Sequence, residues 1–187
     1  HVVGMALKPD TSPALFDALD LKADLDHRII DIRDNEAVAV CVRDARPEII
    51  FHLAAQPLVR ASYAQPVETF ATNISGTVSV LEALRGSDVR AAIMVTTDKV
   101  YRNAEHGLPY SEDDVLGGHD PYSASKAASE LVIASYRDCF LASHGIAVAT
   151  ARAGNVIGGG DWSADRLIPD TVRAWTGGIP LHIRCPD

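Results

Sequence analysis

The sequence predicts a doubly wound α/β fold with a parallel sheet. Apolar runs of strand length alternate with helical patterns of ten or more residues, an order typical of βαβ units. Several of these runs are largely apolar, as in EIIFHL at 48–53 and AAIMVT at 91–96. Helices cover strands of this kind on both faces of a parallel sheet. Hydrophobic residues make up 47% of the 187 residues and charged residues 22%, which fits a globular chain.

The predicted elements follow one another without an internal repeat. Pro66 is typical of the first turn of a helix, and Gly86 and Gly145 are typical of the residue after a helix. Residues 8–26 are expected to be mostly loop with a short helix, and the loop 100–120 is long enough to favour a functional role. Strands are expected at 1–7, 27–30, 48–53, 91–96 and 146–151, and helices at 35–45, 66–84, 122–143 and 165–175.

The two ends of the sequence lead us to expect a piece of a longer protein. The chain begins with the strand-like run HVVGMAL and without an initiator methionine. A further strand-like run, LHIR at 181–184, lies three residues before the end.

Charge and composition argue against several classes of protein. Lysine and arginine number 17 against 25 aspartate and glutamate, so the net charge is −8, whereas non-specific binding to nucleic-acid phosphates needs a basic surface. No apolar run approaches the roughly 20 residues that span a bilayer, and no signal peptide is visible. Cys41, Cys139 and Cys185 are far apart in sequence and fit neither a disulfide framework nor a metal site, which favours a reducing cytoplasm.

Polar residues follow two buried strands, at the edge where ligands bind in open α/β sheets. Thr97, Asp98 and Lys99 come after strand 91–96. They offer a hydrogen-bond donor, an acid, and an amine that becomes a base if partial burial lowers its pKa. A capped turn with a salt bridge explains the same residues equally well. At 54–56, AAQ would let the backbone approach a ligand closely, although tight packing of the turn is the simpler interpretation.

Tyr122 and Lys126 lie four residues apart at the start of a predicted helix and therefore share one face. A lysine ammonium beside a phenol favours the phenolate, and the ordinary pKa of the phenol is about 10. Tyr122 is thus a candidate base that removes a hydroxyl proton while a hydride leaves the same carbon. The alternative is a surface tyrosine above a solvated lysine, and YxxxK alone is frequent by chance.

The motifs together resemble one family, the extended short-chain dehydrogenases/reductases, which include NAD-dependent nucleotide-sugar epimerases and dehydratases. Within it the chain is similar to the CDP-glucose 4,6-dehydratases, and the lysine after Asp98 separates this group from the dTDP-glucose enzymes, which carry glutamate there. The matching segments are HLAAQPLV at 52–59, TNISGTVSVLEA at 72–83, TTDKVY at 96–101, PYSASKAASELV at 121–132, RAGNVIGGGDW at 152–162 and DRLIPD at 165–170.

The resemblance implies a Rossmann-like NAD-binding domain over 1–153 that lacks its first βα unit, and the start of a smaller substrate-binding lobe over 154–187. The family begins with a strand and a glycine-rich turn that holds the NAD pyrophosphate at a helix N-terminus, and no such unit is visible here. LKP at 7–9 ends the first strand without the acidic residue that selects NAD. The choice of NAD over NADP therefore rests on the resemblance.

The resemblance also implies a reaction. CDP-glucose would become CDP-4-dehydro-6-deoxyglucose, with NAD regenerated. Tyr122 would take the proton of the sugar 4-hydroxyl, Lys126 would hold the nicotinamide ribose and tune Tyr122, and Thr97 would hydrogen-bond the 4-oxygen. Lys99 would remove the C5 proton, and Asp98 would help the 6-hydroxyl to leave as water.

Other matched positions imply contacts to the cofactor and the substrate. Asp31 and Ile32 would flank the adenine, and Asn73 would be a polar group near the active site. His52 is expected to be a packed strand histidine, the cysteines ordinary core or surface residues, and the tryptophans packing residues of the substrate lobe. The further cofactor positions are Leu53, Ala54, Ala55, Gln56, Thr96 and the segment from Arg152 to Val156, and the substrate positions are Asn155, Arg166, Leu167 and Ile168.

Two other functions stay open at this point. One is a different nucleotide-sugar epimerase or dehydratase of the same family, although a simple epimerase needs no acid and base for water loss. The other is a non-catalytic nucleotide-binding relative, although such relatives typically lose the tyrosine or the lysine. The resemblance further implies a homodimer paired through helices 66–84 and 122–143.

Overall fold

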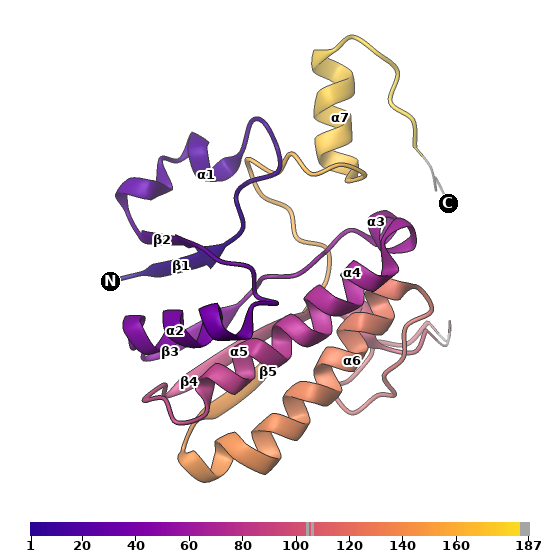
Figure 1. Cartoon of the computed structure of the whole chain (residues 1–187). Coiled ribbons are helices and arrows are strands. Elements are labelled where there is room, and N and C mark those ends of the chain that lie inside the picture. The colour runs from indigo at the N-terminus through magenta and orange to yellow at the C-terminus, as the bar shows by residue number, and fades with distance from the viewer. Residues whose placement is uncertain (104, 106, 184–187) are drawn as a thin grey trace. The chain divides into compact units, whose positions relative to one another are not determined.

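The structure is a computed structural model that describes residues 1–103, 105 and 107–183 (Figure 1). β1 and β2 form a two-stranded sheet, and a second sheet has the order β3-β4-β5. In the second sheet both outer strands run parallel to β4, with Ile49 and Ala147 each opposite Ala91. The α/β fold class with a parallel sheet is therefore confirmed. The strands of the described ranges are β1 (Val3–Ala6), β2 (Asp26–Ile29), β3 (Ile49–His52), β4 (Ala91–Thr97) and β5 (Ala147–Ala153).

The helices of the described ranges lie between and after these strands. They are α1 (Leu15–Ala18), α2 (Asn35–Ala45), α3 (Val59–Ala64), α4 (Pro66–Phe70), α5 (Gly76–Leu84), α6 (Pro121–Tyr136) and α7 (Leu167–Thr176). A π-helical turn, Ala71–Ser75, joins α4 to α5, and another, Arg137–Leu141, extends α6. None of the helices in these ranges is long and apolar enough to cross a membrane.

Most expected elements are present, but the structure has one helix that was not expected and lacks one strand that was. α3 was not predicted, because a six-residue helix shows little periodicity and Pro66 disfavours helical geometry in the residue before it. The strand expected at 181–184 is absent over the described residues 181–183, and Arg184 lies outside the described residues. Cys185, expected to be an ordinary residue, also lies outside them.

Side-chain caps set where α2 and α6 begin. Asp34 Oδ1 accepts a hydrogen bond from the Ala37 amide at 3.0 Å, and Asp120 Oδ1 accepts one from the Ser123 amide at 2.9 Å. Pro121 occupies the first turn of α6, where its missing N–H costs nothing. The start of α6 is thus fixed by its own sequence, which matters because Tyr122 lies in that turn.

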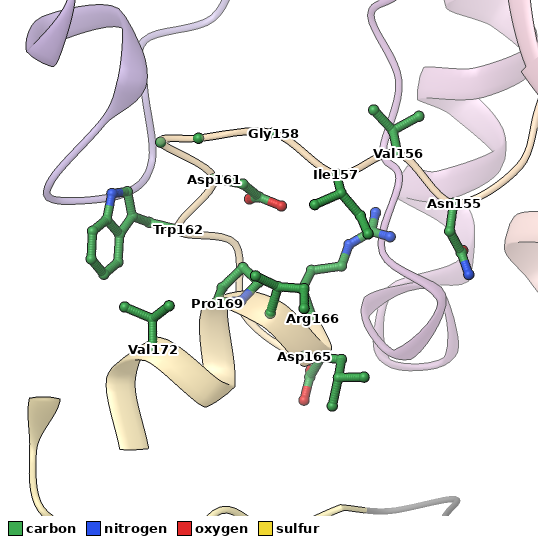
Figure 2. Close-up of a pocket in the computed structure, with 14 residues that line it drawn as sticks. Asn155, Val156, Ile157, Gly158, Asp161, Trp162, Asp165, Arg166, Pro169 and Val172 are labelled. Carbon is green, nitrogen blue, oxygen red and sulfur yellow. The ribbon is translucent and has the colours of Figure 1, made fainter. Parts of the chain in front are cut away.

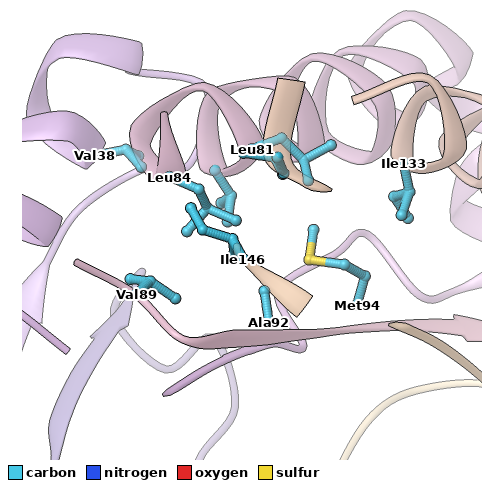
Figure 3. Packing of buried hydrophobic residues seen from close by; sticks show 10 residues of the cluster. Val38, Leu81, Leu84, Val89, Ala92, Met94, Ile133 and Ile146 are labelled. Atoms are coloured by element: carbon cyan, nitrogen blue, oxygen red, sulfur yellow. The ribbon is translucent and has the colours of Figure 1, made fainter. Parts of the chain in front are cut away.

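The core lies between the β3-β4-β5 sheet and helices α2, α5 and α6 (Figure 3). Leu81 and Leu84 of α5, Met94 of β4 and Ile133 of α6 are at most 1% exposed. Burial of one such side chain is worth about 1.5–3 kcal/mol. This packing joins β4 to α5 and to the second half of α6, and both β4 and α6 carry candidate site residues.

The described residues divide into two compact units. The larger one comprises Met5–Leu7 and Arg28–Gly154, and the smaller one comprises His1–Gly4, Lys8–His27 and residues 155–183. In the smaller unit Gly160 has φ +80°, and a Cβ added there would lie 2.3 Å from Leu15 Cδ1. A side chain there would be strained, because the backbone has a left-handed geometry that favours glycine and because Leu15 packs against this position.

Candidate active site

Tyr122 and Lys126 lie on one face of α6 and are both buried, at 8% and 6% exposure. The Tyr122 amide donates to Ser62 Oγ at 3.2 Å, and the Tyr122 carbonyl accepts from Ser125 Oγ at 2.7 Å. The loop before α6 also packs closely, because a Cβ at Gly118 would lie 2.3 Å from Ser123 Cβ. This burial rules out the alternative of a surface tyrosine above a solvated lysine.

The Lys126 ammonium reaches the end of the sheet. Its Nζ donates to the carbonyl of Val95 on β4 at 3.1 Å. Burial lowers the pKa of Lys126 to about 8, while the nearby Glu130 carboxylate acts in the opposite direction. Lys126 therefore carries its charge at neutral pH and loses it in mildly alkaline solution.

Thr97, Asp98 and Lys99 form a capped turn at the end of β4. Thr97 Oγ1 accepts a hydrogen bond from the Lys99 amide at 3.4 Å and donates one to Asp98 Oδ1 at 3.1 Å. Lys99 Nζ lies 3.8 Å from Asp98 Oδ1, and the two side chains are 43% and 53% exposed. The turn packs against α6, and Gly154 leaves room beside Asp98, since a Cβ there would be 3.7 Å from Oδ2. The structure thus contains the salt bridge of the simpler interpretation, on a turn that lies against the helix with Tyr122.

Asn73 connects the turn after β3 to α6. Its side chain is 1% exposed, accepts from the Gln56 amide at 2.8 Å and donates to the Gln56 carbonyl at 3.1 Å. Its Nδ2 also donates to Ser125 Oγ at 2.8 Å, and Ser125 bonds the Tyr122 carbonyl. The sequence indicated Asn73 and Gln56 as site residues, whereas the linking role of Ser125 was not predicted.

Glu130 is a second residue that the sequence analysis missed. It lies one turn beyond Lys126 on α6, is 5% exposed, and accepts from Thr96 Oγ1 at 2.5 Å. Burial alone would raise the pKa of Glu130, but hydrogen bonds from Arg152 and Thr96 hold it below its ordinary value. The Arg152 side chain, which was expected beside the cofactor, pairs with Glu130. The spacing of four from Lys126 was the available sequence signal.

Asp31 and Ile32, which were expected to flank the adenine, have different surroundings. The Asp31 carboxylate accepts a hydrogen bond from Arg33 Nε at 3.0 Å, and the hydrogen bonds and charge of Arg33 lower its pKa. The Ile32 side chain is buried under α5, where a Cβ on Gly76 would come within 2.4 Å of it. Any contact from Ile32 to a ligand must therefore use its main chain. Leu53, at the end of β3, is 69% exposed.

His52 is a packed strand histidine, as expected. It is 6% exposed, and burial together with the Lys126 charge lowers its pKa to about 4, so the ring is neutral at pH 7. Its Nε2 lies 3.1 Å from Thr77 Oγ1, and that hydroxyl already donates to the Asn73 carbonyl. Nε2 must therefore be the protonated ring nitrogen.

The smaller unit contains a pocket of about 510 Å³ (Figure 2). It is lined by the glycine-rich segment and the first turns of α7, and all four substrate candidates, Asn155, Arg166, Leu167 and Ile168, are among its lining residues. Trp162 also lines it, while Trp175 is 86% exposed and does not pack as expected. The Arg173 guanidinium ties α7 to the segment before it by donating to the Trp162 and Ser163 carbonyls, each at 3.0 Å.

Sequence comparison relates the chain to nucleotide-sugar dehydratases. The family model described as GDP-mannose 4,6 dehydratase matches residues 14–173. The chain is 45% identical to a CDP-glucose 4,6-dehydratase of Salmonella typhimurium over 99% of its own length and 53% of that protein. It therefore spans about half the length of this relative.

Structural comparison agrees with the sequence match. The dTDP-glucose 4,6-dehydratase of Streptomyces venezuelae, solved with NAD and TYD bound, matches with a TM-score of 0.81 and 28% identity, over 98% of this chain and 56% of that one. A UDP-glucose 4-epimerase of Thermotoga maritima matches with a TM-score of 0.85 and 22% identity, over 99% of this chain and 58% of that one, which supports the fold alone. Because the family model covers most of the sequence, the chain belongs to the GDP-mannose 4,6 dehydratase family.

Proposed function

We propose that this chain carries the catalytic face of an NAD-dependent hydro-lyase that converts CDP-glucose to CDP-4-dehydro-6-deoxyglucose. The observation that carries the proposal is the buried pair of Tyr122 and Lys126 on α6, packed beside the turn of Thr97, Asp98 and Lys99. The 45% identity to a CDP-glucose 4,6-dehydratase supports the choice of nucleotide. We assign cofactor binding to residues 1–153 and the beginning of a substrate-binding lobe to residues 154–187.

NAD is the proposed cofactor, and the residues at the carboxyl ends of β3 and β4 suit it. Ala54 and Ala55 are small enough for close approach, and Asn73 fixes the main chain of Gln56 beside them. Lys126 has three N–H groups, of which the Val95 carbonyl takes one, so the ammonium can also bind a ribose hydroxyl. When bound, NAD would supply a hydride acceptor for C4 and, once reduced, a hydride donor for C6. The proposed contacts are Asp31, Ile32, Leu53, Ala54, Ala55, Gln56, Thr96, Tyr122, Lys126 and the main chain from Arg152.

Side chains of this chain carry out the proton transfers of the proposed reaction. Tyr122 in its phenolate form removes the proton of the sugar 4-hydroxyl. The positive charge of Lys126 stabilises that phenolate. The Thr97 hydroxyl, which donates to Asp98 in this structure, donates to the sugar 4-oxygen when substrate is present. Once C4 is a ketone the C5 proton is acidic. Lys99 in its amine form removes that proton, and Asp98 in its carboxylic acid form gives its proton to the 6-hydroxyl, which leaves as water.

The nucleotide part of the substrate is assigned to the pocket of the smaller unit. Arg166 offers a planar cation for phosphate, Asn155 offers an amide, and Leu167 and Ile168 offer apolar surface. We also propose a homodimer paired through α4–α5 and α6, because a two-fold interface of helices is self-complementary. Light scattering that shows a monomer for the full-length protein would contradict the dimer.

The function is tested by incubating the full-length protein with CDP-glucose. The product is detected by the ultraviolet absorbance that 4-keto sugars develop in alkali. Tyr122→Phe serves as the matched inactive control, and dTDP-, UDP- and GDP-glucose test the nucleotide preference. We expect product from CDP-glucose with the wild type only. Interconversion of the sugar at C4 without loss of water would instead favour an epimerase.

A further inference from the structure

Arg152 joins separate segments of the larger unit through one guanidinium group. Its Nε and Nη2 donate to the two carboxylate oxygens of Glu130, both at 3.1 Å. Its Nη1 donates to Tyr101 Oη at 3.0 Å and to the Glu112 carbonyl at 2.9 Å. The guanidinium carbon also lies 4.9 Å from the centre of the Tyr101 ring. A planar fork with fixed donors suits these partners, whereas a single ammonium would not reach all of them.

Tyr101 directly follows the turn that carries Asp98 and Lys99. The 3₁₀ turn Asp98–Val100 leads directly into it, and Tyr101 pairs with Leu116 in an isolated antiparallel bridge. The Gly117 amide donates to the Val100 carbonyl at 2.8 Å, so the two ends of the segment 101–116 are closed together. The contacts of Arg152 are therefore made next to the turn that carries Lys99.

Tyr122 and Lys126 are held by other groups. Ser62 and Ser125 bond the main chain of Tyr122, and the Val95 carbonyl binds Lys126. The hydroxyl of Tyr101 takes no part in these hydrogen bonds. Loss of the Tyr101 hydroxyl would therefore disturb the turn that carries Lys99 and leave the hydrogen bonds of Ser62 and Ser125 to Tyr122 in place.

We infer that Arg152 is a positioning residue for water loss: by holding Tyr101 it keeps the turn of Lys99 where that side chain can remove the C5 proton. The inference rests on the proposed function. It adds that Arg152 supports the step at C5, while other residues support the step at C4. The ion pair with Glu130 fixes the position of the Arg152 guanidinium. Nη1 of that guanidinium binds the Tyr101 hydroxyl and so holds the end of the turn. Removal of the contact between Arg152 and Tyr101 slows the step at C5 and spares oxidation at C4.

Tyr101→Phe tests this inference, because it deletes one hydroxyl and keeps the ring that stacks on Tyr110 at 4.7 Å. In single-turnover reactions of the full-length protein with CDP-glucose, we expect reduced cofactor to appear at the wild-type rate. We expect product to form about ten to a hundredfold more slowly. Without substrate, amide hydrogen exchange over 101–117 should become faster. Tyr110→Phe is the matched control, since its hydroxyl bonds Arg102 and Asn103 and should leave the balance between the two steps unchanged.

Arg152→Lys is the second variant, because it keeps a cation opposite Glu130 but loses the fork. It should show the same selective slowing, and if it fails to fold, Tyr101→Phe decides alone. Equal slowing of both steps in Tyr101→Phe would indicate a merely structural contact and overturn the inference, as would an unchanged rate of product formation. A wild-type protein that never oxidises CDP-glucose would overturn the proposed function and this inference with it.

Discussion

The two groups of side chains proposed for catalysis differ in their surroundings. Tyr122 and Lys126 are less than 10% exposed and lie on a helix that is capped, packed and hydrogen-bonded to β4. Asp98 and Lys99 lie on a short turn with side chains about half exposed. The first group is enclosed by the chain itself, whereas the side chains of the second group remain partly open to solvent. Oxidation at C4 and water loss should therefore respond differently to mutation.

The largest effect is expected for Tyr122→Phe, which deletes only the phenol oxygen. The proposed base for the 4-hydroxyl proton is then missing, and loss of a general base typically costs about a hundredfold to ten-thousandfold. The rate of cofactor reduction with CDP-glucose measures it. Circular dichroism and NAD binding should match the wild type, and near-normal turnover would end the assignment of Tyr122.

Lys99→Ala should separate the two halves of the reaction. Tyr122, Lys126 and Thr97 remain, so oxidation at C4 proceeds, while removal of the C5 proton slows by about a hundredfold. Reduced cofactor should then accumulate and remain visible by absorbance. If the variant instead loses thermal stability and keeps its product formation, Lys99 is only the salt-bridge partner of Asp98, and Asp98 becomes the better candidate at C5.

Lys126→Met should change how stability depends on pH. The pKa of Lys126 is about 8 in the folded chain against 10.5 as the ordinary value. Between these values the unfolded state binds a proton that the folded state lacks, so the free energy of unfolding rises with pH by up to about 1.4 kcal/mol per unit. Lys126→Met lacks this rise. Urea unfolding across that window should show it for the wild type and for the control Lys99→Met.

The smallest effect is expected for the stability of Asp98→Asn. Exposed ion pairs such as Asp98 with Lys99 contribute about 0–1 kcal/mol, so the unfolding midpoint in urea should hardly move. A much larger loss would mean that the turn depends on its salt bridge, and the contrast between buried side chains on α6 and half-exposed side chains on the turn would fail.

The sequence predicted the regular elements well where the signals were local. α2 was expected at 35–45 and is observed at Asn35–Ala45, because Asp34 caps its start and Arg46 ends it with φ +43°. The two long helices were expected as single segments, and their π-helical turns were not, since such turns leave no clear trace in apolar spacing. The strand expected at 181–184 is not formed over 181–183, where no strand of the described residues pairs with this segment.

For the site, residues close in sequence were predictable and partners distant in sequence were not. Tyr122 and Lys126 follow from helical spacing, and Thr97 to Lys99 follow from their place after a strand. The pairing of Glu130 with Arg152 joins α6 to β5, 22 residues apart, and only the parallel register that places Arg152 beside Thr96 makes it visible. The pKa of Lys126 likewise depends on burial by neighbours that periodicity does not reveal.

α6 is bonded to two consecutive residues of β4. Lys126 binds the Val95 carbonyl and Glu130 accepts from Thr96. The two helix residues are about 6 Å apart along the axis and the two strand residues about 3.3 Å apart, so both bonds form at only one sliding position of the helix. The inner face of α6 therefore sets the place of Tyr122, and substitutions on its outer surface, where Leu131 is 65% exposed, should act on the proposed dimer contact rather than on Tyr122.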